Sequence, residues 1–134
     1  MHVFTTDPKG GLKLWRLEHT FREVNESEMV GGDPSKEYQA SLVAEFMSTF
    51  LARIVCIDAS FVDELLVCGD QRGNLVVFEF PVGLIDVDNA IMQENFQTFC
   101  SFKGAHGISS VDSISVARSN GNQICICSTG KALR

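Results

Sequence analysis

Apolar and polar residues alternate in short runs along this chain, and turn-forming residues separate the runs. Alternation over about four to eight residues is typical of β-strands that bury one face. Strands are therefore expected near 3–6, 12–17, 42–47, 53–58, 65–68, 75–80, 96–102, 111–116 and 124–128. The Asn-Gly sequence within Ser119–Asn122 is expected to join the last two strands as a hairpin. The pattern predicts an all-β protein.

One nine-residue stretch occurs twice, 63 positions apart. Asp7–Trp15 and Asp70–Phe78 agree in their acidic first residue, a basic third residue, a glycine at the fourth position and apolar residues at the sixth, eighth and ninth. An Asp can accept hydrogen bonds from the amides of a turn, and a glycine tolerates a positive φ. Each copy therefore predicts a strand, a tight turn and a second strand, and the repetition indicates a repeat protein.

Residues 42–55 permit a second interpretation. Leu42, Phe46, Phe50 and Ile54 recur at a spacing of four, which is the pattern of an amphipathic helix. Part of the same segment also alternates in twos. A four-stranded unit needs two strands before residues 65–68, so the repeat favours strands at 42–47 and 53–58.

The order of the predicted elements resembles a WD40-type β-propeller repeat, whose blades are four-stranded antiparallel sheets. In that family a loop His, a Ser or Thr on a strand, an Asp in the turn and a Trp at a strand end form a hydrogen-bonded structural tetrad. The resemblance assigns these positions, together with the turn glycines, to Thr5, Asp7, Gly10 and Trp15, to Asp70, Gly73 and Phe78, and to His106 and Ser128. Cys68 and Phe78 depart from the pattern, since they replace the hydroxyl and the indole, and no unit contains the full set.

The resemblance implies a partial propeller with one complete four-stranded blade and parts of two neighbours. Equivalent points lie 63 residues apart, against about 40–45 in a standard WD repeat. Two insertions account for the excess and would project as partner-specific surface. The expected division is a C-terminal hairpin of one blade at 1–17, a polar, solvated insertion at 18–40, a complete blade at 41–80, an insertion at 81–95 and an incomplete blade at 96–134.

Several segments are similar to one branch of the WD family, the large multi-propeller proteins, here of plant type, that partner a tRNA 2′-O-ribose methyltransferase acting at the wobble position. These segments are Ala52–Cys56, Val67–Leu75, His106–Val111 and Ser128–Gly130. The resemblance implies a non-catalytic scaffold whose partners are the methyltransferase and the remaining blades, with tRNA contacted only indirectly. The alternative is a protein-interaction propeller of another pathway, such as vesicle traffic or ubiquitin ligation.

The charge and residue composition of the chain disfavour several classes of function. The net charge is −6 and the 11 basic residues are scattered, which disfavours a nucleic-acid surface on this segment. Because the chain has neither a run of about 18 apolar residues nor a signal-peptide pattern, no membrane partner and a cytoplasmic location are expected. Buried, reduced thiols are expected, since the cysteines are odd in number and most lie in apolar runs; they are Cys56, Cys68, Cys100, Cys125 and Cys127.

No set of residues predicts a catalytic, cofactor or metal site. Asp7 and Asp70 are turn residues without a base or nucleophile at a matching position. His106 lies among glycines, which favours a structural role, and Ser128 lacks the strand–turn–helix elbow of a hydrolase nucleophile. The chain is expected to be an interaction protein and not an enzyme.

The C-terminal residues depart from the family pattern. After Ser128–Gly130 the family has a basic residue, an Asp and a Gly, whereas this sequence continues with Lys131–Arg134. A truncated segment is therefore expected. Because repeated units stabilise one another through their shared faces, the chain alone is expected to be marginally stable or to self-associate.

Overall fold

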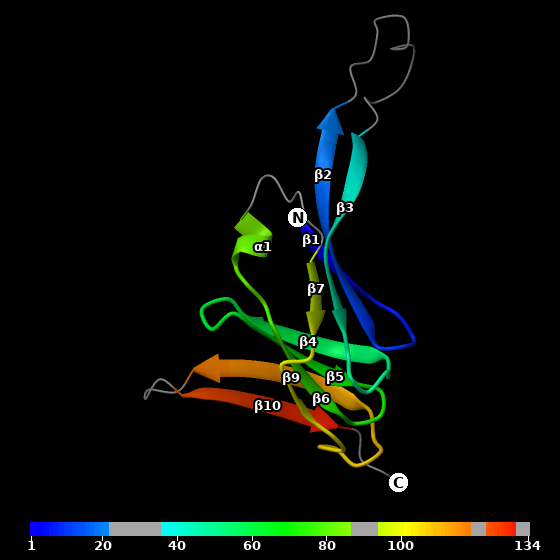
Figure 1. Ribbon diagram of the computed structural model, residues 1–134, viewed down its shortest axis with the longest axis vertical. Helices are drawn as coiled ribbons and strands as arrows, with labels where there is room; N and C mark the ends of the chain where they lie inside the picture. The colour runs from blue at the N-terminus through cyan, green and yellow to red at the C-terminus, as the bar shows by residue number, and fades with distance from the viewer. Residues whose placement is uncertain (22–35, 87–93, 119–122, 131–134) are drawn as a thin grey trace, which may run out of the picture.

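The computed structural model describes residues 1–21, 36–86, 94–118 and 123–130. These residues form an all-β structure of three open sheets, with one short helix (Figure 1). The elements are β1 (His2–Thr6), β2 (Gly11–Phe21), β3 (Lys36–Met47), β4 (Ile54–Ser60), β5 (Leu65–Asp70), β6 (Leu75–Glu79), α1 (Gly83–Asp86), β7 (Glu94–Gln97), β8 (Cys100–Phe102), β9 (Val111–Arg118) and β10 (Ile124–Gly130).

The first sheet has the strand order β1-β2-β3-β7, with β7 parallel to β3 and the other pairs antiparallel. Its β2–β3 ribbon extends far beyond β1 (Figure 1). The expectation of a solvated loop at 18–40 is wrong at both ends, because β2 continues to Phe21 and β3 begins at Lys36. Cross-strand pairing explains the extension: His19 and Tyr38 are direct partners, with ring centroids 4.3 Å apart. Residues 22–35 of that insertion lie outside the described residues.

The second sheet has the order β4-β5-β6-β8. The strand expected at 42–47 is confirmed as part of β3, so the helical alternative for this segment is wrong. Its expected grouping with residues 53–80 is also wrong, because β3 pairs with β2 and the fourth strand of this sheet is β8. β3 pairs antiparallel with β2, the strand before it in the sequence. The number of strands along the sequence does not show which sheet a strand joins.

The single strand expected at 96–102 is instead two strands in different sheets. Between them, the Thr98 hydroxyl accepts a bond from the Thr49 amide (3.1 Å) in the first sheet's loop, and the Phe99 amide donates to the Val77 carbonyl (2.7 Å) in the second sheet. The chain thus crosses from one sheet to the next within two residues. Alternation alone predicts strand conformation and not which sheet a strand joins.

The third sheet is the antiparallel pair β9–β10, which lies beside β4 and β5 (Figure 1). The Asp58 carboxylate accepts a bond from the Val116 amide (2.7 Å), and Arg118 forms an ion pair with Asp63 (2.7 Å). A Cβ on Gly69 would lie 2.6 Å from Val111, so glycine allows the close approach of the two sheets. The predicted turn at 119–122 lies outside the described residues.

The core lies between the first and second sheets and is rich in phenylalanine. Phe46 of β3 stacks on Phe96 (5.0 Å between centroids) and meets Phe78 of β6 edge-on (5.3 Å). Offset and edge-to-face contacts of this kind stabilise packed aromatic rings. The buried cluster consists of Leu12, Leu14, Val43, Ala44, Phe46, Ile54, Leu66, Cys68, Val76, Phe78 and Phe80.

Candidate functional site

The first Asp-Gly turn joins β1 to β2. Asp7 Oδ1 accepts hydrogen bonds from the amides of Lys9 (2.8 Å) and Gly11 (2.9 Å), and the Asp7 amide donates to the Gly11 carbonyl (3.0 Å). Gly10 has a φ of +86°, which favours glycine. The backbone hydrogen bonds from Gly11 and Lys9 hold the pKa of Asp7 below its usual value. Asp7 is thus an ionised acceptor held by its own turn.

The second turn joins β5 to β6 with the same hydrogen bonds. Asp70 Oδ1 accepts from the amides of Arg72 (2.8 Å) and Asn74 (2.9 Å), the Asp70 amide donates to the Asn74 carbonyl (3.0 Å), and Gly73 has a φ of +85°. Asp70 Oδ2 accepts one further bond, from the side-chain amide of Asn74 (2.9 Å). The predicted repetition of strand, turn and strand is confirmed at these two places.

A loop packs on each turn glycine in the same way. The Ser48 amide donates to the Gly10 carbonyl (3.0 Å), and the His106 amide donates to the Gly73 carbonyl (3.0 Å). Each loop continues with a further turn bond, to the carbonyl of Ser48 in one and of His106 in the other. Sequence reasoning missed Ser48, which is fully buried and bonds to the first turn as His106 bonds to the second. Serine and histidine differ in their chemistry, so residue type could not indicate that the two loops are equivalent. Only the position of each loop relative to its turn could have done so.

The expected tetrad positions meet in pairs. Trp15 Nε1 donates to Thr5 Oγ1 (2.8 Å), and His106 Nε2 lies 2.8 Å from Ser128 Oγ. Phe78, which stands at the position of Trp15, is fully buried beside Phe46. Within the described residues, no sheet brings all four tetrad positions together.

The cysteines differ from the expectation of buried thiols. Burial raises the pKa of the Cys68 thiol strongly and that of Cys56 to a lesser degree. Cys100, Cys125 and Cys127 are exposed, so the expectation is wrong for these three. Cys125 and Cys127 lie on a face of the two-stranded third sheet that no described element covers, with their sulfur atoms 3.8 Å apart. Residues of an apolar strand are buried only where another layer packs on their face of the sheet.

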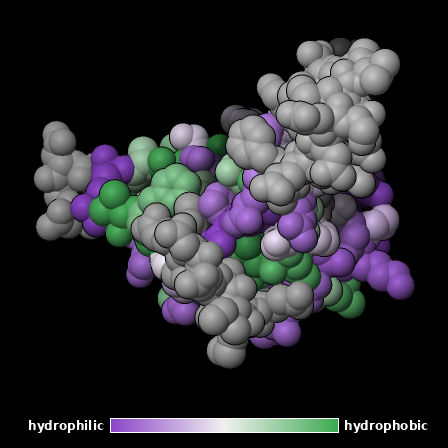
Figure 2. Space-filling view, turned by 90° about the horizontal axis from the view of Figure 1, so that it is seen from above, coloured by the Kyte–Doolittle hydropathy of each residue, from purple (hydrophilic) through white to green (hydrophobic). Residues whose placement is uncertain are grey.

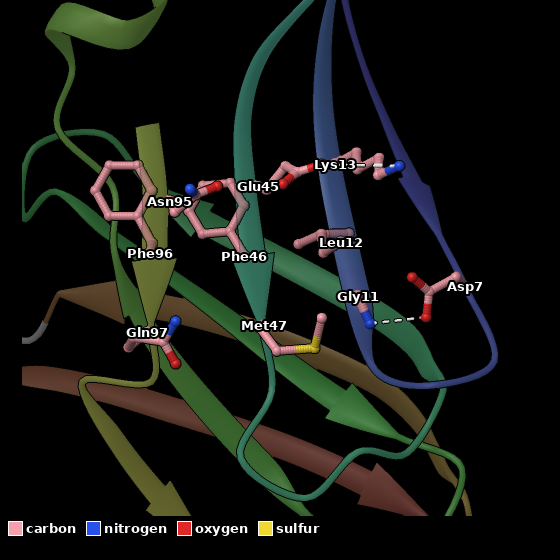
Figure 3. A pocket seen from close by; sticks show the side chains of 10 residues that line it. All are labelled: Asp7, Gly11, Leu12, Lys13, Glu45, Phe46, Met47, Asn95, Phe96 and Gln97. Carbon is pink, nitrogen blue, oxygen red and sulfur yellow. Dashed lines mark hydrogen bonds and ion pairs between the residues drawn. The ribbon is translucent and has the colours of Figure 1, made fainter. Parts of the chain in front are cut away.

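A cavity of about 320 Å³ opens beside the first turn, between β2, β3 and β7 (Figure 3). The Phe46 and Phe96 rings form its apolar wall, and Lys13 and Glu45 form an exposed ion pair (3.8 Å). The Asp7 carboxylate faces Gly11, to which it is already bonded (Figure 3). The lining residues are Asp7, Gly11, Leu12, Lys13, Glu45, Phe46, Met47, Asn95, Phe96 and Gln97. The cavity can make non-covalent contacts with a bound molecule. The Asp7 carboxylate is bonded within its turn, and the Glu45 carboxylate forms the ion pair with Lys13.

The other face of the first sheet carries a shallow apolar hollow of about 290 Å³. Val3, Trp15 and Leu17 line it together with Thr5 and Ala40. Apolar residues also reach the surface in several places between polar ones (Figure 2). Exposed apolar hollows of this kind are typical of interaction surfaces.

The described residues contain no group of three or more His, Cys, Asp or Glu side chains that could hold a metal ion. None of the helices in the described part of the chain is long and apolar enough to cross a bilayer. No protein-family model matches the chain, and comparison with curated proteins and with solved structures gives no significant match.

Proposed function

We propose that the chain is a non-catalytic scaffold built from WD-type propeller units, acting in the cytoplasm as part of a tRNA 2′-O-ribose methyltransferase complex. In this proposal the chain holds the methyltransferase and contacts tRNA only indirectly, through the enzyme and through other blades. The proposal treats the three sheets as consecutive blades, the second of them complete. The specific partner comes from the sequence resemblance alone.

The matched turns at Asp7 and Asp70 are the observation that carries the proposal. Two stretches with the same hydrogen bonds, the same glycine φ and the same packing loop support a unit built more than once. Repeated sheets stack through their faces and leave loops and edges for partners. Because propeller folds host many functions, the choice of pathway needs a direct test.

Affinity capture combined with an activity assay tests the proposal. The tagged 134-residue chain is incubated with plant lysate, and the captured material is assayed for S-adenosylmethionine-dependent 2′-O-methylation of tRNA at the wobble nucleotide. We expect activity in the captured material and none with the purified chain alone. Capture of coat or ubiquitin-ligase subunits without this activity would favour the alternative pathway, and activity of the purified chain would overturn the non-catalytic role.

A matched pair of variants links capture to the fold. Asp70→Ala removes a fully buried carboxylate that accepts three hydrogen bonds, and it is expected to abolish capture. Asp112→Ala changes an exposed carboxylate outside the turns and should capture as well as the unaltered chain. Equal capture by both variants would show that binding does not need the folded repeat.

A further inference from the structure

Two thiols lie side by side on one face of the third sheet. Cys125 and Cys127 are two residues apart on β10, so the alternation of a strand places both side chains on the same side of the sheet. Their sulfur atoms are 3.8 Å apart, and both residues are exposed. The pair is formed by one strand and needs no other element to bring the sulfur atoms together.

Small residues lie beside the two thiols across the sheet. Cys125 is opposite Ala117 of β9, and Cys127 is opposite Ser115. Both of these residues are exposed as well. Alanine and serine are too short to cover a neighbouring sulfur atom, so both thiols are open to a ligand from solvent.

The other three cysteines have different surroundings. Cys68 is fully buried in the core. Cys56 is half-buried, and its sulfur atom lies 3.6 Å from the Val111 carbonyl oxygen. Cys100 is exposed, but it lies on β8 in the second sheet. Cys100 therefore provides a matched control, because it is a solvent-exposed strand thiol outside the pair.

The spacing of the two thiols suits a bridging ion better than a disulfide. Two residues of a strand span about 6.4 to 6.8 Å, which is at the upper end of the Cα separation of about 4.4 to 6.8 Å found in disulfides. With a metal–sulfur bond of about 2.3 Å, two thiolates on one ion lie about 3.8 Å apart at a tetrahedral angle and about 4.6 Å apart in a linear arrangement. The observed 3.8 Å lies at the near end of that range. Rotation of the two side chains is enough to reach the rest of it.

The set of donors decides which ion fits. Thiolates are soft ligands that favour Cu(I) and zinc over hard cations. Structural zinc sites use four ligands. In the part of the chain that the structure describes, the two thiols belong to no group of three or more His, Cys, Asp or Glu side chains that could hold a metal ion. Cu(I) is satisfied by two thiolates, so it is the ion that this pair can hold alone.

We propose that Cys125 and Cys127 form a binding site for one Cu(I) ion, which bridges the two sulfur atoms. Each thiol releases its proton to solvent as its copper–sulfur bond forms, and copper stays Cu(I), so no electron is transferred. The hydrogen bond between the thiols raises the pKa of Cys127. Copper therefore competes with protons for the sulfur atoms, and the affinity rises with pH.

Competition with a chelator tests the site. The reduced 134-residue chain is titrated under nitrogen into the coloured Cu(I) complex of bicinchoninate, and the loss of colour reports transfer of copper to the protein. We expect transfer of one Cu(I) per chain, with a higher affinity at higher pH. Absence of transfer, or an affinity that does not change with pH, would overturn the proposal.

Three serine variants locate the ligands. Cys125→Ser and Cys127→Ser should each weaken Cu(I) binding about 100-fold, because the second thiolate must then come from another molecule. Cys100→Ser should bind as tightly as the unaltered chain. All three thiols are exposed, so serine disturbs little packing, and circular dichroism checks the fold. A loss in Cys100→Ser that equals the loss in Cys127→Ser would contradict the site.

Alkylation maps the ion on the unaltered chain. One equivalent of Cu(I) should protect Cys125 and Cys127 from iodoacetamide while Cys100 stays reactive, as measured by peptide mass spectrometry. X-ray absorption should show two sulfur neighbours around copper. Protection of Cys100 instead, or a third sulfur neighbour, would contradict the proposal. The partner of the proposed scaffold does not enter these tests, so either proposal can fail alone.

Discussion

The Asp7 and Asp70 turns have the same local structure in different surroundings. Their carboxylates bond the amides two and four residues ahead, and their glycines differ in φ by only one degree. Asp70 is fully buried and gains a bond from the Asn74 side chain, while Asp7 is half-buried. Local sequence therefore sets the conformation of the turn. We expect the packing of neighbouring sheets to set how much each turn contributes to the free energy of unfolding.

The surroundings differ because the sheets are stacked. The second sheet lies between the first sheet, through Phe46 and Phe78, and the third, through Asp58 and Val116. The face of the first sheet that carries Trp15 has no described layer over it. Matched substitutions in the two units can therefore separate two contributions to the free energy of unfolding, that of the turn and that of the sheet packed over it.

The largest difference is expected between Phe78→Ala and Trp15→Ala. Removing the fully buried Phe78 ring should lower the free energy of unfolding by about 3 to 5 kcal/mol. Trp15 is only partly buried and forms one hydrogen bond, so its removal should cost about 1 to 2 kcal/mol. Urea titration followed by circular dichroism measures both values, and equal losses would show that the face carrying Trp15 is also covered.

The second comparison is Asp70→Ala against Asp7→Ala. Asp70 accepts three bonds in a buried site, so its loss leaves buried donors unpaired and should cost about 3 kcal/mol. Asp7→Ala exposes its turn amides to water and should cost about 1 kcal/mol. The same urea titration measures both variants. A larger loss for Asp7 would mean that burial does not control the contribution of this turn.

The glycines give a third, smaller comparison. A Cβ at Gly73 would lie 2.6 Å from the Ser109 carbonyl oxygen, and one at Gly10 would lie 3.0 Å from backbone atoms of Ala52. Gly73→Ala should cost about 2 to 3 kcal/mol and Gly10→Ala about 1 to 2 kcal/mol, because both also require a positive φ. Gly107→Ala is the control, since it has a φ of +66° but open space around it, and should cost about 1 kcal/mol. A Gly107 variant as unstable as Gly73 would show that φ alone sets the cost.

The turns could be predicted from sequence because their structure depends on residues within four positions. Asp, Gly and alternating apolar residues specified both hairpins. The sheet that each strand joins could not be predicted, because it depends on distant contacts such as Thr98 with Thr49. The length of the β2–β3 ribbon was missed for the same reason. Glu18 and His19 pair with Gln39 and Tyr38 across the strands while all four side chains stay exposed, and composition shows no sign of such pairing.

The candidate site shows the same division. The contacts of Thr5 with Trp15 and of His106 with Ser128 join residues that the family resemblance had already named. Ser48 was missed because its part is played by its backbone amide, which any residue other than proline supplies. Exposure of Cys125 and Cys127 was missed because it depends on what covers the third sheet. Pairs of side chains with matching chemistry could be predicted from the sequence. Long-range backbone contacts and the burial of a sheet face by another layer could not.

The smallest expected effect is the dependence of stability on acid. The pKa of Asp7 is lowered by hydrogen bonds from Gly11 and Lys9, and that of Asp63 by bonds from Arg118 and then Ser60. A lowered pKa stabilises the folded state above the ordinary carboxyl pKa of about 3.9, and this contribution is lost as the pH falls through the folded value. The thermal midpoint should therefore fall below about pH 4, and less steeply in Asp7→Asn and Asp63→Asn.

Salt separates the two carboxylates. The Arg118–Asp63 ion pair is half-exposed on the arginine side, so added salt should weaken its share of the acid dependence. Asp7 is held by backbone amides of its own turn, and short hydrogen bonds within one turn are little affected by screening. In 0.5 M NaCl, a concentration at which the Debye length is only about 4 to 5 Å, Asp63→Asn should therefore resemble the unaltered chain more closely than Asp7→Asn does. If salt removed the Asp7 contribution instead, distant charges and not the turn itself would hold that carboxylate ionised.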